Sequence, residues 1–214
     1  MKKILFQGDS ITDCYRPREE DKYLGAGYSE LICGEMQYKY GGEYGFVNRG
    51  ISGNRITDLF ARIKSDIINL KPDYVSILIG VNDVWHEIES QNGVSTEIFE
   101  KIYSMLIETL LSELPDIKIM IMEPFVLKYT ATNATDEQPW RWNDFHNGVS
   151  EKAAAVKRIS EKYSLPFVPL QAKFDNAAER IGTESLTVDG VHPSPGGHKL
   201  IANEWLKSFE ENFL

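Results

Sequence analysis

Short, almost continuously apolar segments alternate along the chain with longer segments in which apolar residues recur every three to four positions. The short segments predict five strands, because such runs bounded by Gly or Pro are typical of strands that are covered on both faces. They lie at residues 3–6, 45–48, 74–80, 118–124 and 166–170. The longer segments predict helices, since their spacing places apolar side chains on one helical face. The clearest of them lie at residues 56–70, 98–110, 141–163 and 195–213.

This alternation predicts an α/β protein in which a parallel sheet carries helices on both faces. Right-handed crossovers between parallel strands distribute the helices over the two faces, which gives a three-layer α/β/α sandwich. A chain of this length buries roughly 70% of its unfolded surface in one core, so we expect one domain over residues 1–214. The long irregular stretch at residues 125–139 follows the fourth strand. A loop of this kind is more often functional or mobile than structural.

Composition and charge exclude several classes of function. A formal net charge of -9 opposes binding to nucleic acid or to an anionic membrane surface. No apolar stretch approaches the length of a membrane span, and the N-terminus lacks the apolar segment of a signal peptide, which predicts a cytoplasmic protein. In that reducing compartment the two cysteines, Cys14 and Cys33, are expected to be free thiols.

Four polar groups follow predicted strands. In a parallel sheet the carboxyl ends of the strands meet at one edge, and ligands bind in the crevice outside that edge. We therefore expect the four groups to converge on one site, although they lie far apart in the sequence. They are residues 8–10, 50–54, 80–83 and 189–193.

The side chains in these groups are suited to acyl transfer by a serine nucleophile. Serine needs a base within hydrogen-bond reach, and an imidazole oriented by a carboxylate is the usual one. Ser10 would be the nucleophile, His192 the base, and Asp189 the carboxylate that orients His192. The oxyanion of the tetrahedral intermediate would be stabilised by the backbone N–H groups of Ser10 and Gly53 and by the side-chain amide of Asn82.

The same four groups match, in order, the sequence blocks of the SGNH (GDSL-type) hydrolases, and the chain resembles this family over essentially its whole length. The matching strings are GDS at 8–10, NRGISGN at 48–54, GVND at 80–83 and DGVH at 189–192. The resemblance implies a flavodoxin-like, five-stranded sheet in the order 2-1-3-4-5. It also implies the same roles for Ser10, Gly53, Asn82, Asp189 and His192, and hydrolysis without a cofactor.

A narrower resemblance concerns the substrate. The strings at 50–54, 71–73 and 79–85 look like those of bacterial intracellular acetylxylan esterases, which deacetylate xylo-oligosaccharides. This likeness implies that the chain removes a small acyl group, acetyl, from a carbohydrate. The expected partner is thus a small acylated molecule, and self-association into a homo-oligomer is left open.

Weaker candidates for substrate contact lie near the same loops. They are Asp9, beside the nucleophile, and the tryptophans Trp85, Trp140 and Trp142, because aromatic faces commonly bind sugar rings. No trio of potential ligands has the spacing of a metal site, so we expect no metal.

Two other functions remain open from the sequence. One keeps the same residues but acts on a lipid or thioester, as a lysophospholipase or thioesterase does. The other is a non-catalytic, flavodoxin-like module that binds a nucleotide or phosphate at the strand ends. The chain contains no Gly-rich phosphate loop, which disfavours the second function.

Overall fold

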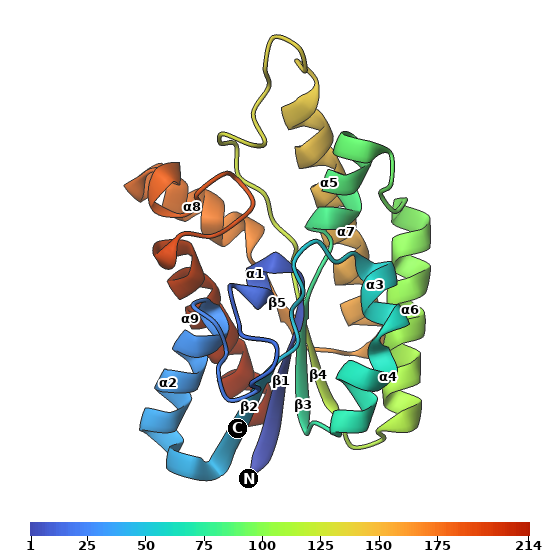
Figure 1. The fold of residues 1–214 in the computed structure, drawn as a ribbon, viewed down its shortest axis with the longest axis vertical. Helices are drawn as coiled ribbons and strands as arrows, with labels where there is room; N and C mark the ends of the chain where they lie inside the picture. The colour runs from blue at the N-terminus through green and yellow to red at the C-terminus, as the bar shows by residue number, and fades with distance from the viewer.

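The computed structural model describes residues 1–214 and contains a five-stranded sheet between two layers of helices (Figure 1). The strands lie in the order β2-β1-β3-β4-β5, and every neighbouring pair is parallel. This order confirms the predicted α/β class and the sheet topology that the family resemblance implies. The strands are β1 (Lys2–Gly8), β2 (Tyr44–Asn48), β3 (Tyr74–Leu78), β4 (Lys118–Met122) and β5 (Phe167–Val168).

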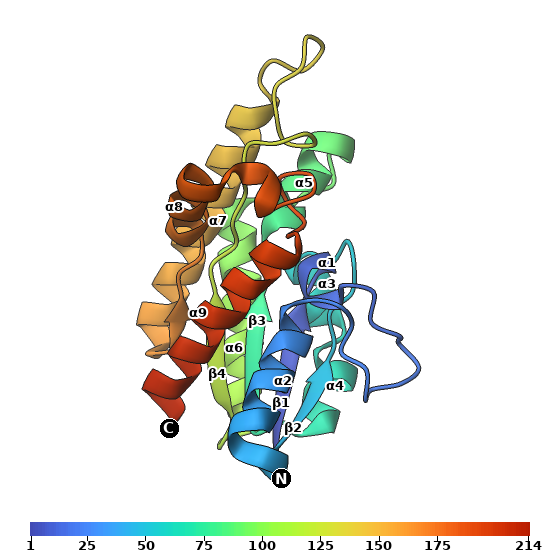
Figure 2. The ribbon, with the colours of Figure 1, turned by 90° about the vertical axis from the view of Figure 1, so that its left-hand side faces the viewer.

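Helices cover both faces of the sheet (Figures 1 and 2). The first face carries α2 (Tyr28–Tyr40), α8 (Gln171–Ile181) and α9 (Pro195–Phe213). The second face carries α3 (Ile56–Ala61), α4 (Ile63–Asp66), α6 (Thr96–Glu113) and α7 (Arg141–Tyr163). The short helices α1 (Ser10–Asp13) and α5 (Val81–Ser90) begin directly after β1 and β3, at the carboxyl edge of the sheet. Three 3-10 turns complete the fold, at Gly41–Glu43, Ile68–Leu70 and Thr183–Ser185.

The core consists of two apolar clusters, one on each side of the sheet. Successive strand residues alternate between them, as the pleat of a strand requires. In β1, Ile4 and Phe6 belong to the cluster under α2 and α9, whereas Leu5 belongs to the cluster under α3 and α6. No helix is both long enough and apolar enough to cross a bilayer.

The prediction of a single continuous helix over residues 56–70 is wrong. The helix is interrupted at Arg62, whose backbone leaves the helical region, and it continues as α4 and a 3-10 turn. The side chain of Arg62 turns toward the carboxyl edge of the sheet, where it donates to the carbonyl oxygens of Arg49 and Gly8 and to the side chain of Asn54. The apolar face is nevertheless kept, since Leu59 on α3 is completely buried.

The last strand is shorter than predicted. Residues 166–170 were expected to form it, but only Phe167–Val168 pair with β4. Pro166 and Pro169 flank this pair, and proline has no N–H to donate to a sheet. Helices α2, α5 and α8 are absent from the sequence-based prediction; α5 places the Asn82 group at a helix N-terminus rather than in an open loop.

Candidate active site

Ser10 is the first residue of α1, just after β1, the strand that lies between β2 and β3. The N-cap residue Asp9 accepts a hydrogen bond from the backbone N–H of Ile11 at 3.0 Å, which starts the helix at this point. Because Ser10 begins the helix, its own N–H has no acceptor within the helix. The side chain and the N–H of Ser10 are thus both presented at the carboxyl edge of the sheet.

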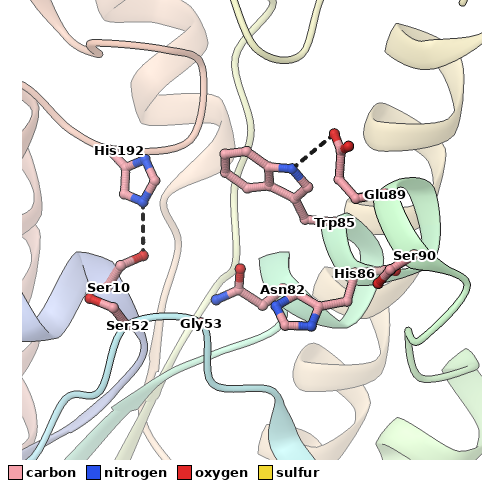
Figure 3. A pocket seen from close by; sticks show the side chains of 9 residues that line it. All are labelled: Ser10, Ser52, Gly53, Asn82, Trp85, His86, Glu89, Ser90 and His192. Carbon is pink, nitrogen blue, oxygen red and sulfur yellow. Dashed lines mark hydrogen bonds between the residues drawn. The ribbon is translucent and has the colours of Figure 1, made fainter.

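Ser10, His192 and Asp189 form a continuous hydrogen-bonded chain, of which Figure 3 shows the contact between Ser10 and His192. The Ser10 Oγ lies 2.9 Å from Nε2 of His192, and Nδ1 of the same ring lies 2.6 Å from Oδ2 of Asp189. A proton on Nδ1 is held by the carboxylate, so the lone pair of Nε2 faces the Ser10 hydroxyl. This is the tautomer in which an imidazole accepts a proton from serine.

A tight turn holds Asp189 and His192 together. The second carboxylate oxygen of Asp189, Oδ1, accepts the backbone N–H groups of Val191 and His192 at 2.8 and 2.7 Å. The stretch at 125–139 supports this turn from outside, since Leu127 donates to the carbonyl oxygen of Gly190 and Ala131 to that of Asp189. This stretch, expected to be functional or mobile, therefore has a structural role beside the site.

The ion pair between Asp189 and His192 shifts both pKa values. Burial favours the neutral form of Asp189, but hydrogen bonds from His192 and the turn outweigh it and hold the pKa of the carboxyl below its ordinary value. The hydrogen bond that Nδ1 of His192 donates to Asp189 raises the pKa of His192 above its ordinary value of 6.5, against the opposing effect of burial. The imidazole is therefore more basic than a free histidine.

Gly53 lies in a four-residue turn after β2. The N–H of Asn54 donates to the carbonyl oxygen of Ile51 at 3.2 Å, and Gly53, the third residue of the turn, has φ of +82°. A type II turn requires this positive φ, which favours glycine. The N–H of Gly53 has no acceptor in the protein, and Gly53 lines the cavity beside Ser10. It is thus free to donate to a ligand.

Asn82 lies in the first turn of α5 and is 6% exposed. One of its amide hydrogens is used, because Nδ2 donates to the carbonyl oxygen of Asn54 at 3.2 Å. An amide has two N–H groups, so the second remains available toward the cavity. The structure therefore brings together all five residues that the sequence placed in one acyl-transfer site.

A cavity of about 400 Å³ opens beside Ser10 and His192 (Figure 3). Trp85 is the aromatic side chain in its wall, and its ring centroid lies 5.7 Å from that of His192. The Trp85 indole donates to Glu89 at 3.3 Å, and Glu89 is paired with the largely buried Arg141. The indole is thus held in place at the cavity wall. The lining residues are Ser10, Ser52, Gly53, Asn82, Trp85, His86, Glu89, Ser90 and His192.

The other expected substrate contacts are placed elsewhere. Trp140 is 42% exposed at the start of α7, and Trp142 packs half-buried against the core with its ring 5.2 Å from that of His146. Neither tryptophan lines the cavity.

Asp9 is not a substrate contact in this structure, which corrects the expectation from its position beside Ser10. It is 1% exposed, and its side chain caps α1 instead of facing the cavity. Burial raises the pKa of Asp9 to about 7. Its charge is nevertheless close enough to help raise the pKa of His192.

A second cavity of about 380 Å³ lies on the other side of Ser10, with Cys14 and His198 in its lining. His198 accepts the backbone N–H of Tyr28 and contacts the Cys14 sulfur at 3.4 Å. Burial lowers the pKa of His198 to about 4 and raises that of the Cys14 thiol. Both groups are therefore neutral near pH 7, and both cysteines are free thiols.

The comparison with known proteins agrees with this geometry. The sequence profile of the GDSL-like Lipase/Acylhydrolase family matches residues 6–200. The chain belongs to this family. As a member of it, the protein is a carboxylic ester hydrolase, and the family resemblance read from the four sequence blocks is confirmed.

Two relatives are similar over almost their whole length. An acetylxylan esterase from Geobacillus stearothermophilus is 36% identical, with 96% of this chain and 93% of that protein covered. Its crystal structure superposes with a TM-score of 0.83 at 34% identity, over 97% of this chain and 93% of the other. A GDSL-like lipase from Parabacteroides merdae superposes with a TM-score of 0.90 at 33% identity, over 98% and 95% of the two chains. Catalytic mutants of the Geobacillus enzyme replace a serine or an aspartate by alanine.

Sequence reasoning missed several residues that line the cavity. His86, Glu89 and Ser90 lie on α5, within one and a half helical turns beyond Trp85. Their spacing would have indicated one helical face if the segment after β3 had been predicted as a helix. Ser52 precedes Gly53 and was not singled out, because a serine in a turn has no distinguishing pattern.

Proposed function

We propose that the protein removes acetyl groups from a carbohydrate such as an acetylated xylo-oligosaccharide, through an acyl-enzyme formed on Ser10. The observation that carries the proposal is the chain of contacts from Ser10 through His192 to Asp189, beside the free N–H of Gly53. Nucleophile, base and oxyanion donor are the groups that ester hydrolysis needs, and Ser10, His192 and Gly53 would supply them beside one cavity.

In the proposed acylation step, Ser10 Oγ attacks the carbonyl carbon of the acetyl ester while His192 Nε2 accepts its proton. The N–H groups of Ser10 and Gly53 and the Asn82 amide stabilise the oxyanion. The intermediate then collapses, the bond to the sugar oxygen breaks, and His192 returns the proton to that oxygen.

Deacylation repeats the sequence with water as the nucleophile. His192 accepts a proton from the water that attacks the acetyl-serine, and the Ser10 oxygen leaves and regains a proton from His192. Acetate is released. Asp189 keeps the ring in the required tautomer through both steps and stabilises its charged form.

The carbohydrate part of the proposal is supported by the α5 side of the cavity. Trp85 offers an aromatic wall, and the polar side chains of His86, Glu89 and Ser90 lie beside it. An aromatic surface combined with hydrogen-bonding groups is suited to a sugar ring. The similarity to the Geobacillus acetylxylan esterase supports the same substrate class.

Acetate release tests the substrate class. We expect acetylated xylo-oligosaccharides to be deacetylated, and p-nitrophenyl esters to be hydrolysed more slowly as the acyl chain lengthens beyond acetyl.

Glu89→Gln tests whether Glu89 supports sugar binding, because it removes the negative charge that pairs with Arg141 beside the Trp85 indole. We expect kcat/KM for the acetylated sugar to fall about ten-fold, and kcat/KM for p-nitrophenyl acetate to change less than about two-fold. Glu87→Gln is the matched control, because Glu87 lies on the same helix and lines a different cavity.

Two results would contradict this substrate. Hydrolysis that accelerates with acyl chain length would favour a lipid or thioester substrate. An equal loss on both acetyl esters in the Glu89 variant would show that Glu89 supports the reacting groups rather than the sugar.

The pH profile tests the role of His192 as the base. The base must be neutral, so kcat/KM for p-nitrophenyl acetate should rise with pH through a pKa above 6.5.

Asp9→Asn should shift this profile. It keeps a helix cap but removes a negative charge that favours the protonated form of His192. The pKa of His192 then falls, and the rise in activity moves to lower pH. Asp116→Asn, an exposed change before β4 at the opposite edge of the sheet, should leave the profile in place. A profile that does not move in the Asp9 variant would exclude this charge effect.

A further inference from the structure

The backbone N–H groups of residues 49–56, around the Gly53 turn, are almost all engaged within the protein. Every N–H in this segment donates to an acceptor in the protein except that of Gly53. Buried or half-buried N–H groups are nearly always paired, so one unpaired N–H that lines a cavity is a prepared donor. The contacts on either side of Gly53 therefore decide where this donor points.

Asp13 makes the contact immediately before Gly53. Its Oδ2 accepts both the backbone N–H of Ser52, at 2.9 Å, and the Ser52 hydroxyl, at 3.1 Å. Asp13 is 4% exposed, and its third partner is Arg18, at 3.0 Å. Hydrogen bonds to a buried carboxylate are stronger than those between neutral groups.

Asp13 is also the last residue of α1, the helix that begins with Ser10. One side chain thus connects the helix of the proposed nucleophile to the turn of the proposed oxyanion donor. The two segments are also in close contact, because a Cβ on Gly50 would lie 2.3 Å from the backbone nitrogen of Asp13.

The direction of the Gly53 N–H depends on the conformation of the turn. A type I turn differs from a type II turn mainly by rotation of the peptide between its second and third residues. Here that peptide joins Ser52 to Gly53, so the rotation would turn the Gly53 N–H away from the cavity and bring the Ser52 carbonyl toward it. Two hydrogen bonds to Asp13 fix Ser52 on one side of this peptide.

We propose that Asp13 is a positioning residue of the oxyanion hole, which keeps the Gly53 N–H directed at the reacting ester by holding Ser52. The inference rests on the proposed role of Gly53 as an oxyanion donor. It gives Asp13 no contact with the substrate; its effect passes through the turn.

Asp13→Asn keeps the size of the side chain and removes its charge. We expect kcat for p-nitrophenyl acetate to fall about ten-fold while KM changes less than about two-fold, because the oxyanion exists only in the transition state and the intermediate. The rate at which a serine-directed phosphonate labels Ser10 should fall in parallel, since its tetrahedral adduct needs the same donors. Arg18→Gln is the matched control; it removes the third partner of Asp13 but none of its contacts with Ser52, and it should leave both rates unchanged.

A double-mutant cycle with Gly53→Ala separates positioning from a general structural effect. A Cβ at Gly53 would find only the His86 ring, at 4.0 Å, so alanine acts through the positive φ rather than by a clash. Gly53→Ala alone should lower kcat about 100-fold, and adding Asp13→Asn should lower it less than about two-fold further, because the donor is already misdirected. Fold losses that multiply in the double variant would overturn the inference.

Phosphonate labelling of Ser10 distinguishes a failure of the proposed function from a failure of the proposed role of Asp13. If the phosphonate does not label Ser10 in the wild-type protein, the proposed function fails. If it labels the wild type and the Asp13 variant equally fast, only the role of Asp13 fails. Should circular dichroism show that Asp13→Asn does not fold, Ser52→Ala replaces it in the same cycle. It removes one of the two hydrogen bonds that Ser52 donates to Asp13. It should lower kcat about three-fold when Gly53 is present and not at all in the Gly53→Ala variant.

Discussion

Ser10→Ala is expected to lower kcat for p-nitrophenyl acetate by about 10⁴-fold or more, leaving only the slow hydrolysis that the cavity supports without a nucleophile. The substitution removes one oxygen whose contact is with His192. The free energy of unfolding should therefore change by less than about 1 kcal/mol, and thermal denaturation can establish that the lost activity is not lost folding.

Mass spectrometry supplies the matching chemical test. A serine-directed phosphonate should add one adduct to the wild-type protein and none to the Ser10 variant. Ser112→Ala, an exposed change on α6, serves as the control and should be labelled as fast as the wild type. Undiminished hydrolysis by the Ser10 variant would remove this residue from the mechanism.

Asn82→Ala should lower kcat for the same ester by about 10² to 10³-fold with little change in KM, which is the usual effect of removing one oxyanion donor. Both hydrogens of the amide matter here, since one holds the carbonyl oxygen of Asn54 and the other faces the cavity. Asn82→Asp is the sharper variant, because it keeps the shape, loses both donors and adds a negative charge beside the developing oxyanion. It should be at least as inactive as the alanine variant. A rise in KM at constant kcat would instead assign Asn82 to ground-state binding.

The sequence was sufficient to predict the sheet and the five residues at its carboxyl edge. Continuous apolar segments mark buried parallel strands, and the polar groups of the site follow those strands directly. Ser10 and Gly53 could therefore be placed at one edge from the position of β1 and β2 alone, without knowledge of side-chain contacts.

The contacts that hold the site depend on side chains that meet only after folding. Arg62, where the predicted helix is interrupted, donates to the carbonyl oxygens of Arg49 and Gly8, and no local pattern indicates these contacts. The sequence predicts Asp9 as a substrate contact, because it is a polar neighbour of Ser10. Its burial follows from the way α1 packs at the sheet edge, which periodicity does not describe.

The positions of the tryptophans also depend on contacts that form only after folding. Trp85, Trp140 and Trp142 were equivalent candidates in the sequence, since each lies near a site loop. Only Trp85 is on the helix that lines the cavity, and its orientation depends on a pairing between Glu89 and Arg141 that spans two helices.

The hydrogen bond between Ser10 and His192 joins residues 182 positions apart. During synthesis, the ribosome adds the proposed nucleophile and oxyanion donors, Ser10, Gly53 and Asn82, long before it adds His192, the proposed base. A nascent chain that contains β1 to β4 therefore includes Ser10, Gly53 and Asn82. It still cannot cleave an ester by this chemistry, because it lacks His192. If His192 is the base as proposed, the appearance of esterase activity in a translation or refolding reaction reports the docking of the last quarter of the chain.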